Sequence, residues 1–214
     1  MSELDEIARY HLSELEVARS PSDPRRNVPV VPPGTQRILD IGCGAGQTLI
    51  AMDRRGAAAV GIDYDFSALQ LGKQWDHTLQ LLQATGEVLP FPDQSFDFVA
   101  SRVALPYMKI AVAVRETARV LRPAGRLWFT LHPLSMLDWK QSVKSPRALA
   151  FQVYLLANTL ALHAGAQQFR YPLKTSRTES YQTERGMRKC LEKAGFDRIE
   201  FQRNQHFTVT AVKR

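Results

Sequence analysis

Three glycines alternate with other residues in the stretch DIGCGAG, which runs from Asp40 to Gly46 directly after an apolar segment. Glycine permits positive φ and has no Cβ, so the backbone can approach a ligand closely and point its N–H groups at it. The spacing D-x-G-x-G-x-G differs from the dinucleotide fingerprint G-x-G-x-x-G, and Asp40 places a negative charge where a pyrophosphate would be unfavourable. The loop therefore predicts a ligand with a cationic ammonium or sulfonium group.

A second acid stands at the end of the next strand-like segment, in VGIDYD. Asp63 is placed to accept hydrogen bonds from both hydroxyls of a ribose, and Tyr64 can lie against an adenine face. The alternatives are glycines in an isolated tight turn and Asp63 as a helix N-cap. In combination, the glycines and the two acids favour a nucleoside that carries an amino-acid-like tail.

The chain alternates strand-like and helix-like segments between residues 37 and 132. The predicted strands are 37–41, 58–62, 79–84, 96–101 and 126–132, and the predicted helices are 47–55, 66–75 and 109–121. A helix over 183–194 precedes two strand patterns, 197–202 and 206–213, which can pair antiparallel across a short polar turn. We therefore expect an α/β fold, a Rossmann-like doubly wound sheet of seven strands that is mostly parallel and ends in an antiparallel C-terminal pair.

With 214 residues, 44% of them hydrophobic, the chain is expected to form a single domain over residues 1–214. Its parts are an N-terminal helix and linker (1–36), the core (37–132), a helical cap insertion after the fifth strand (133–182), and the C-terminal helix and strands (183–214). The amphipathic helix over 2–20 is expected to cover one flank of the core, and a lid over a ligand is the alternative.

The segment 133–182 shows no strand pattern and is expected to roof the active site. Its helix over 148–164 is apolar around most of its circumference, with Gln152, Thr159 and His163 in a narrow polar stripe. We expect this helix to be buried on more than one side, either as a cap over an apolar pocket or as a subunit interface, in a monomer or a homodimer. Because 148–164 falls short of about 20 residues, no membrane span is predicted.

Several separate stretches resemble the class I S-adenosylmethionine-dependent methyltransferases, specifically the group called the type 11 methyltransferase domain. LDIGCGAGQ is similar to the cofactor loop of that family, GIDYD to its ribose-binding strand end, GEVLPFPDQSFDFV to its middle signature and RETARVLRPAGRLWF to its later helix-turn-strand. The resemblance covers residues 37–132 and, more weakly, 183–214. It implies the cofactor S-adenosylmethionine, with S-adenosylhomocysteine as product.

The resemblance assigns roles to particular residues. It implies that Gly42 and Gly44 contact the methionine part, with Asp40 and Cys43 in the same loop, and that Asp63 and Tyr64 hold the nucleoside. Thr85 and Gly86 fall where the family contacts adenine, and Arg102 falls where a backbone carbonyl meets the amino group. Two positions depart from the family pattern: Thr85 replaces a common acid, and RPAG replaces a more usual double glycine.

Methyl transfer from a sulfonium is an in-line displacement, so much of the catalysis can come from positioning the acceptor and excluding water. A base is optional, and it would help with a hydroxyl or protonated amine as acceptor. His132, at the end of the fifth predicted strand, is the first candidate, with a capping or core histidine as the alternative. Tyr107, in SRVALPYM, is the second candidate.

Some acceptors are disfavoured. SRVALPYM replaces the N/D-P-P-aromatic motif of enzymes that methylate planar amides or base amino groups. Neither Cys43 nor Cys190 is placed to act as the nucleophile of cytosine C-methylation. Metal-dependent O-methylation would need a cluster of oxygen ligands around the strand ends, and none stands out in the sequence. The sequence leaves an O, N or C atom of a small molecule as the expected acceptor.

The formal net charge is +7, and residues 138–193 hold ten Lys or Arg against four Asp or Glu. A solvated basic face is the default interpretation, and an anionic or apolar small substrate is preferred over RNA phosphates.

Two cysteines without metal spacing and no secretory leader predict a cytoplasmic protein. The competing functions are an RNA or protein methyltransferase, a non-catalytic cofactor-binding module and, less favoured, an NAD-dependent oxidoreductase.

Overall fold

Seven strands form one sheet in the order β3-β2-β1-β4-β5-β7-β6. The structure is a computed structural model that describes residues 3–137, 145–172 and 178–214. The strands are β1 Arg37–Ile41, β2 Ala58–Asp63, β3 Gln80–Gln83, β4 Phe96–Ser101, β5 Leu121–Thr130, β6 Phe196–Arg203 and β7 Phe207–Lys213. β1 to β5 pair in parallel, and β7 lies antiparallel between β5 and β6. The predicted seven-stranded, mostly parallel sheet with an antiparallel C-terminal pair is confirmed.

Helices cover both faces of this sheet. They are α1 Glu3–Arg19, α2 Gln47–Ala51, α3 Phe66–Trp75, α4 Ile110–Val120, α6 Pro146–Gly165 and α7 Glu184–Lys193, with short 3₁₀ turns at Leu105–Tyr107 and Leu134–Met136. Successive residues of a strand point to opposite faces, so Leu39 packs into the core formed with α4 and α7, whereas Ile38 packs into the core beneath α2. The side chains of β1 are therefore packed into two separate hydrophobic cores.

Two element boundaries differ from the sequence prediction by four or more positions. α2 ends at Ala51 rather than residue 55, because Met52 adopts an extended backbone and its side chain is buried in the core beneath α2. β5 begins at Leu121 rather than at residue 126: Leu121 pairs with Phe96 and Arg126 with Phe98, so RPAG forms an irregularity inside the strand.

α6 is longer than predicted and is buried on one side. It begins at Pro146, where the Ser145 hydroxyl accepts a hydrogen bond from the N–H of Ala148 at 3.1 Å, and it runs for 20 residues. The predicted shortfall in length was wrong: α6 has 20 residues and is long and apolar enough to cross a membrane by length and composition alone. Its exposed residues Leu149, Val153 and Leu160 lie four and seven positions apart and so share one face, so the expected burial on more than one side is also wrong.

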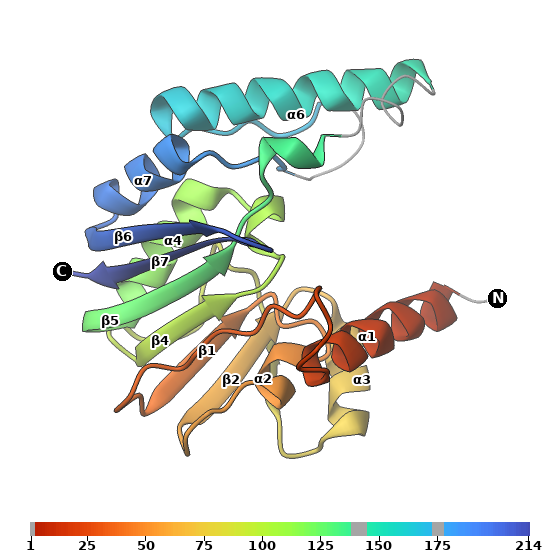
Figure 1. Cartoon of the computed structure of the whole chain (residues 1–214), viewed down its shortest axis with the longest axis vertical. Coiled ribbons are helices and arrows are strands. Elements are labelled where there is room, and N and C mark those ends of the chain that lie inside the picture. The colour runs from red at the N-terminus through yellow and green to blue at the C-terminus, as the bar shows by residue number, and fades with distance from the viewer. Residues whose placement is uncertain (1–2, 138–144, 173–177) are drawn as a thin grey trace.

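Figure 1 shows α1 and the first half of α6 projecting beyond the same edge of the sheet, where β4 and β5 end. α1 packs against α2 and α3, while α6 packs against α7 at the opposite end of the sheet. Ligands of doubly wound folds bind at the carboxyl edge of the strands, near the point where strand order reverses. β1 lies at that point, between β2 and β4.

Candidate functional site

A cavity of about 470 Å³ opens at the carboxyl end of β1. The glycine loop, Asp63 at the end of β2 and Arg102 after β4 all line it, as the sequence predicted for one ligand site. A second cavity of about 730 Å³ continues on the side of β3 and shares Asp63, Tyr64 and Tyr107 with the first. The two cavities can therefore hold two parts of one extended ligand.

The glycine loop lies close to the segment after β4. Gly42 has φ +71, and a Cβ built on it would lie 2.0 Å from the Cβ of Ala104. The N–H groups of Gly42 and Cys43 both donate to the carbonyl of Ile62, at 2.8 and 2.9 Å, which ties the loop to β2. A side chain at position 42 would separate these two walls of the cavity, so this glycine is required by space as well as by φ.

Asp63 joins the loop to the next helix. One carboxylate oxygen accepts the N–H of Gly44 at 2.8 Å, and the other accepts the N–H of Asp65 at 2.9 Å. Because a carboxylate offers about four acceptor positions, each oxygen can accept a further hydrogen bond, and Asp63 lines both cavities. Asp65, not Asp63, is the N-cap of α3, accepting from the N–H of Ser67 at 2.9 Å. The alternative role of Asp63 as a helix cap is thus wrong.

Asp40 is fully buried, and neither of its carboxylate oxygens has a hydrogen-bond partner among the described residues. Burial raises the pKa of Asp40 to about 7, against the opposing effect of Arg102 and with a smaller contribution from Asp63. Asp40 is not among the residues that line either cavity, but it precedes Gly42 by two residues, and Arg102 and Asp63, which both line the first cavity, are close enough to affect its pKa. A cationic group bound nearby would stabilise the ionised form of this buried carboxyl group. The site therefore fits the ammonium or sulfonium group predicted from the sequence.

The second cavity gathers the residues expected at an adenine. Thr85, Gly86 and Tyr64 line it together with Glu87 and Met108. Tyr64 is 73% exposed, so its ring is available for stacking, and a Cβ on Gly86 would lie 2.6 Å from the Sδ of Met108. Glu87 was not predicted as a site residue from the sequence. It accepts a hydrogen bond from the N–H of Lys109 at 3.1 Å and places a carboxylate two residues beyond Thr85.

The N-terminal helix contributes a wall of the first cavity, through Tyr10, His11 and Glu14. Gln47 of α2 meets Nδ1 of His11 at 2.7 Å, and burial lowers the pKa of His11, so the neutral ring can accept this hydrogen bond. α1 therefore covers a flank of the core and the cavity at once. The sequence signal was the pair Tyr10 and Glu14, one turn apart at the border of the apolar face.

Arg102 reaches further than the backbone contact that the sequence implied. Its side chain lies in the first cavity, where one Nη is 2.9 Å from a carboxylate oxygen of Glu14 and Nε donates to the hydroxyl of Thr48 at 3.1 Å. The Arg102 side chain is 10% exposed, so water screens this ion pair little. Arg102 thus fastens α1 to α2 over the cavity, and a ligand carboxylate could meet its remaining N–H groups.

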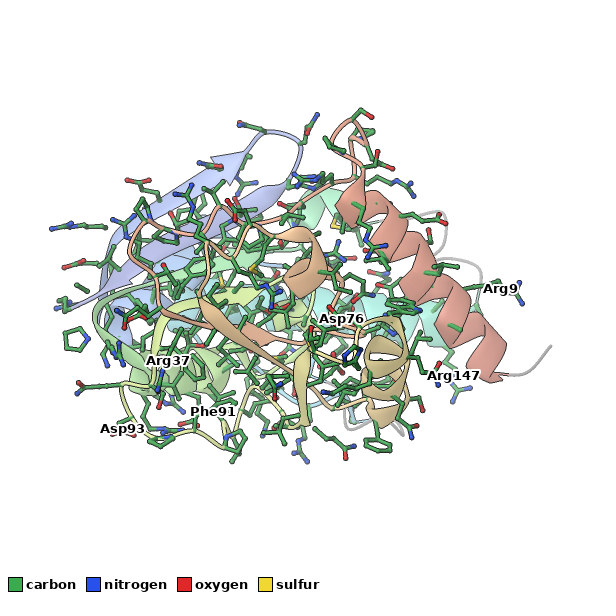
Figure 2. The ribbon with its side chains drawn as sticks, turned by 90° about the horizontal axis from the view of Figure 1, so that it is seen from below. Arg9, Arg37, Asp76, Phe91, Asp93 and Arg147 are labelled. Carbon is green, nitrogen blue, oxygen red and sulfur yellow. The ribbon has the colours of Figure 1, made fainter. Side chains whose placement is uncertain are left out.

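We expect Arg102→Ala to weaken cofactor binding about tenfold or more, because it removes charge-assisted hydrogen bonds at a partly buried site. The measurement is titration calorimetry at constant pH. Arg37→Ala is the matched control, since Figure 2 shows Arg37 on the opposite side of the molecule from α1. Equal affinities in wild type and Arg102→Ala would mean that only the backbone of residue 102 contributes.

The two candidate bases lie in contact, at different depths. Tyr107 lines both cavities, and its ring packs edge-on against His132 with 5.5 Å between centroids. His132 is not among the described residues that line them; its backbone is held by Gln182, and burial lowers the pKa of its side chain. Tyr107 is therefore the better placed of the two.

The predicted roof over the site is not formed by the described part of 133–182, because both cavities are lined by residues from 10–14, 42–48, 63–68, 84–87 and 102–108. Residues 138–144 and 173–177 of that segment lie outside the described ranges.

Cys43 lines the first cavity, but burial raises the pKa of its thiol well above the ordinary value. Within the described residues, no group of three or more His, Cys, Asp or Glu is arranged to hold a metal ion.

Comparison with known proteins finds similarity to methyltransferases in the central part of the chain. The family described as "Methyltransferase domain" matches residues 39–129. An uncharacterized methyltransferase of Bacillus subtilis, YcgJ, is 35% identical over 102 residues, which are 45% of this chain but only 40% of that protein. The ubiquinone/menaquinone biosynthesis C-methyltransferase UbiE of Proteus mirabilis is 29% identical over 78% of this chain and 68% of its own length.

A solved SAM-dependent methyltransferase of Methanosarcina mazei shares the fold, with a TM-score of 0.58 at 20% identity over 86% of this chain and 94% of that one. The matched region contains the glycine loop, Asp63 and Arg102. The site therefore lies where the sequence motifs and the family match coincide.

Proposed function

We propose that this chain, whose residues 39–129 match the methyltransferase domain family, is a class I S-adenosylmethionine-dependent methyltransferase that transfers a methyl group to a small-molecule acceptor. The observation that carries the proposal is the carboxyl group of Asp40, which is fully buried just before the glycine loop and has no hydrogen-bond partner in the described part of the chain. A cationic, amino-acid-tailed nucleoside compensates this charge, whereas the pyrophosphate of NAD would oppose it.

Each part of the cofactor has residues suited to it. Asp63, where the two cavities meet, would accept from the ribose hydroxyls, while Tyr64 and Gly86 would flank the adenine. Gly42, Gly44 and Arg102 would hold the amino-acid tail in the first cavity. When bound, S-adenosylmethionine supplies an electrophilic methyl group on a sulfonium.

The protein contributes position and exclusion of water. α1, fastened by Arg102, covers the first cavity, which limits the access of solvent to the tail. Tyr107 at the junction of the cavities would contact the acceptor through its hydroxyl, while the ring of His132, whose pKa is lowered by burial, packs edge-on against the tyrosine ring and holds it in place. The name of the Proteus relative, which places it in ubiquinone and menaquinone biosynthesis, supports a small organic acceptor for this chain as well.

We expect Tyr107→Phe to lower kcat about 10- to 100-fold while cofactor affinity stays within about twofold, because the ring remains and only the hydroxyl is lost. The assay is transfer of labelled methyl to the acceptor found by screening. His132→Asn, compared alongside, should have a smaller effect at pH 7. A larger loss in His132→Asn would show that the histidine, not the tyrosine, meets the acceptor.

The test of the proposed function has two stages. Calorimetry is run first with S-adenosylmethionine, S-adenosylhomocysteine and NAD, and binding of NAD alone would indicate an oxidoreductase. A labelled-methyl screen with small-molecule, RNA and protein fractions follows. Transfer to RNA or protein would move the acceptor to those classes, and cofactor binding without transfer to any fraction would indicate a non-catalytic module.

A further inference from the structure

Helix α6 exposes apolar residues and buries polar ones, the reverse of an ordinary surface helix. Val153 and Leu160 are 58% and 68% exposed, while Asn158 and Thr159 are buried. From Leu149 to Ala164, every exposed residue of α6 is apolar, and these residues recur every three or four positions. They form one continuous stripe along the helix, which we call the outer stripe.

The buried polar side chains of α6 form hydrogen bonds with backbone groups of the segments that pack against the helix. The amide of Asn158 donates to the carbonyls of Phe169 and Glu179, both at 2.9 Å, and its oxygen accepts the N–H of Phe169 at 2.7 Å. The hydroxyl of Thr159 accepts the N–H of Tyr181 at 3.0 Å. These bonds fix the rotation of α6, so the outer stripe is held outward by the fold.

Figure 1 shows α6 along the outer edge of the molecule, beyond α7 and β6, with its far side turned away from the other elements. The helix contains no Asp or Glu. Arg147 lies in its first turn, and at its other end Lys189 and Lys193 donate to the carbonyls of Ala164 and Gly165, at 2.6 and 3.4 Å. Figure 2 shows Arg147 at the outer rim, on the side of α1. The outer stripe therefore has cations at both ends.

We propose that α6 docks on the surface of a membrane that contains anionic lipids. Leu149, Val153 and Leu160 would enter the boundary between headgroups and acyl chains, and Arg147, Lys189 and Lys193 would meet the anionic headgroups. An apolar helical face with cationic neighbours is the arrangement that binds in this interface. The excess of basic residues over 138–193 acts in the same direction.

A second copy of this chain fits the outer stripe less well. A helix of 20 residues is about 30 Å long, and a stripe about 10 Å wide offers roughly 300 Å², against about 800 Å² on each partner of a standard interface. Pairing two copies would also bring two segments of like charge together. A membrane surface needs no minimum area of this kind and carries the opposite charge.

A membrane-spanning α6 is inconsistent with its packing. Asn158 and Thr159 would leave their backbone partners, and α7 would leave the position where a Cβ on Gly186 would lie 2.9 Å from the carbonyl of Leu162. Buried polar groups that lose their partners cost free energy in hydrocarbon. The proposal is therefore docking on the surface, with the fold unchanged.

The experiment is co-sedimentation of the full chain with vesicles of phosphatidylcholine alone and of phosphatidylcholine with phosphatidylglycerol, without cofactor, so its outcome is separate from that of the methyl-transfer test. We expect binding to the anionic vesicles, weakened by salt, and at least about tenfold weaker in Val153→Asn/Leu160→Gln. Val30→Asn is the matched control, since Val30 is 81% exposed in the linker before β1.

Binding that is equal in the double variant and in wild type would overturn the proposal, as would no binding to anionic vesicles. Light scattering on the same samples tests the second copy: a wild-type dimer that becomes a monomer in the double variant would assign the outer stripe to self-association instead. Resistance of the vesicle-bound protein to alkaline extraction would indicate a span and would also overturn surface docking.

Discussion

Asp63→Ala is expected to weaken the binding of S-adenosylmethionine about 100-fold or more. The carboxylate would lose two hydrogen bonds to the ribose hydroxyls, each worth about 1.5–3 kcal/mol when the acceptor is charged. It would also lose the bond that holds the N–H of Gly44 at 2.8 Å, so the glycine loop would no longer be fixed to the end of β2. Titration calorimetry measures the loss, and Asp63→Asn, which keeps one acceptor, should lie between wild type and alanine.

Asp76→Ala is the matched control for this variant. Asp76 accepts the N–H of Thr78 at 2.9 Å, two residues ahead, in the same local pattern as Asp63 with Asp65, but it lines neither cavity. Thermal unfolding of both variants separates loss of fold from loss of binding. If Asp63→Ala bound the cofactor within about threefold of wild type while remaining folded, the ribose assignment would be wrong.

Asp40→Asn is expected to stabilise the free protein above neutral pH and to weaken cofactor binding there. The pKa of Asp40 is raised by burial from 3.8 to about 7, so the folded state binds a proton that the unfolded state releases. Stability therefore falls as pH rises from 3.8 to about 7, by a total on the order of 4 kcal/mol. Asparagine cannot ionise, so urea unfolding should show a gain of a few kcal/mol at about pH 8, a smaller gain at about pH 5, and little change at or below the unfolded pKa of 3.8.

Cofactor affinity should show the complementary pH dependence. A cationic ligand lowers the pKa of Asp40, so wild-type affinity should rise with pH up to about 7 and then level off. In Asp40→Asn this rise should disappear, and affinity at about pH 8 should be roughly tenfold lower or more. An unchanged pH profile in the variant would mean that the ligand's cation does not lie near Asp40.

Asp97 provides a control of opposite sign. Burial alone would raise its pKa, but hydrogen bonds from the N–H groups of Gln36 and Arg37, with Arg122 beside it, hold the pKa of Asp97 below its ordinary value. Its contribution to stability is therefore present above the pKa of the unfolded state and is lost as the solution is acidified. Asp97→Asn should destabilise the protein near neutral pH, where Asp40→Asn stabilises it.

The mostly parallel sheet and the place of the ligand site could be predicted because they follow from local patterns. Short apolar runs mark β1 and β4 as strands, and glycines directly after β1 mark the loop at the carboxyl edge. Right-handed crossovers then bring Gly42, Asp63 and Arg102 to one edge, since consecutive parallel strands end on the same side. The motif spacing also distinguished a cationic tail from a pyrophosphate.

Other features depend on contacts between residues far apart in the chain. Glu14 meets Arg102 across 88 positions, and only the docking of α1 on α2 and α3 brings them together. Helical periodicity shows which residues share a face but not which partner that face meets, so α1 was expected on a flank and also lines the cavity. The burial of Asp40, and hence its raised pKa, is also decided by tertiary contacts, because Asp40 lies in β1 between β2 and β4.

α6 shows the division between sequence and structure most clearly. Its composition determined that a long apolar helix would follow the fifth strand. Which side faces outward was decided by backbone groups of the segments around Phe169 and Tyr181, which need partners and take Asn158 and Thr159. An unsatisfied buried polar group costs more free energy than an exposed apolar side chain, so the fold turns the polar residues inward. The sequence by itself determined the elements and the cofactor class, and the tertiary structure decided which side chains close the site and which apolar surface remains outside.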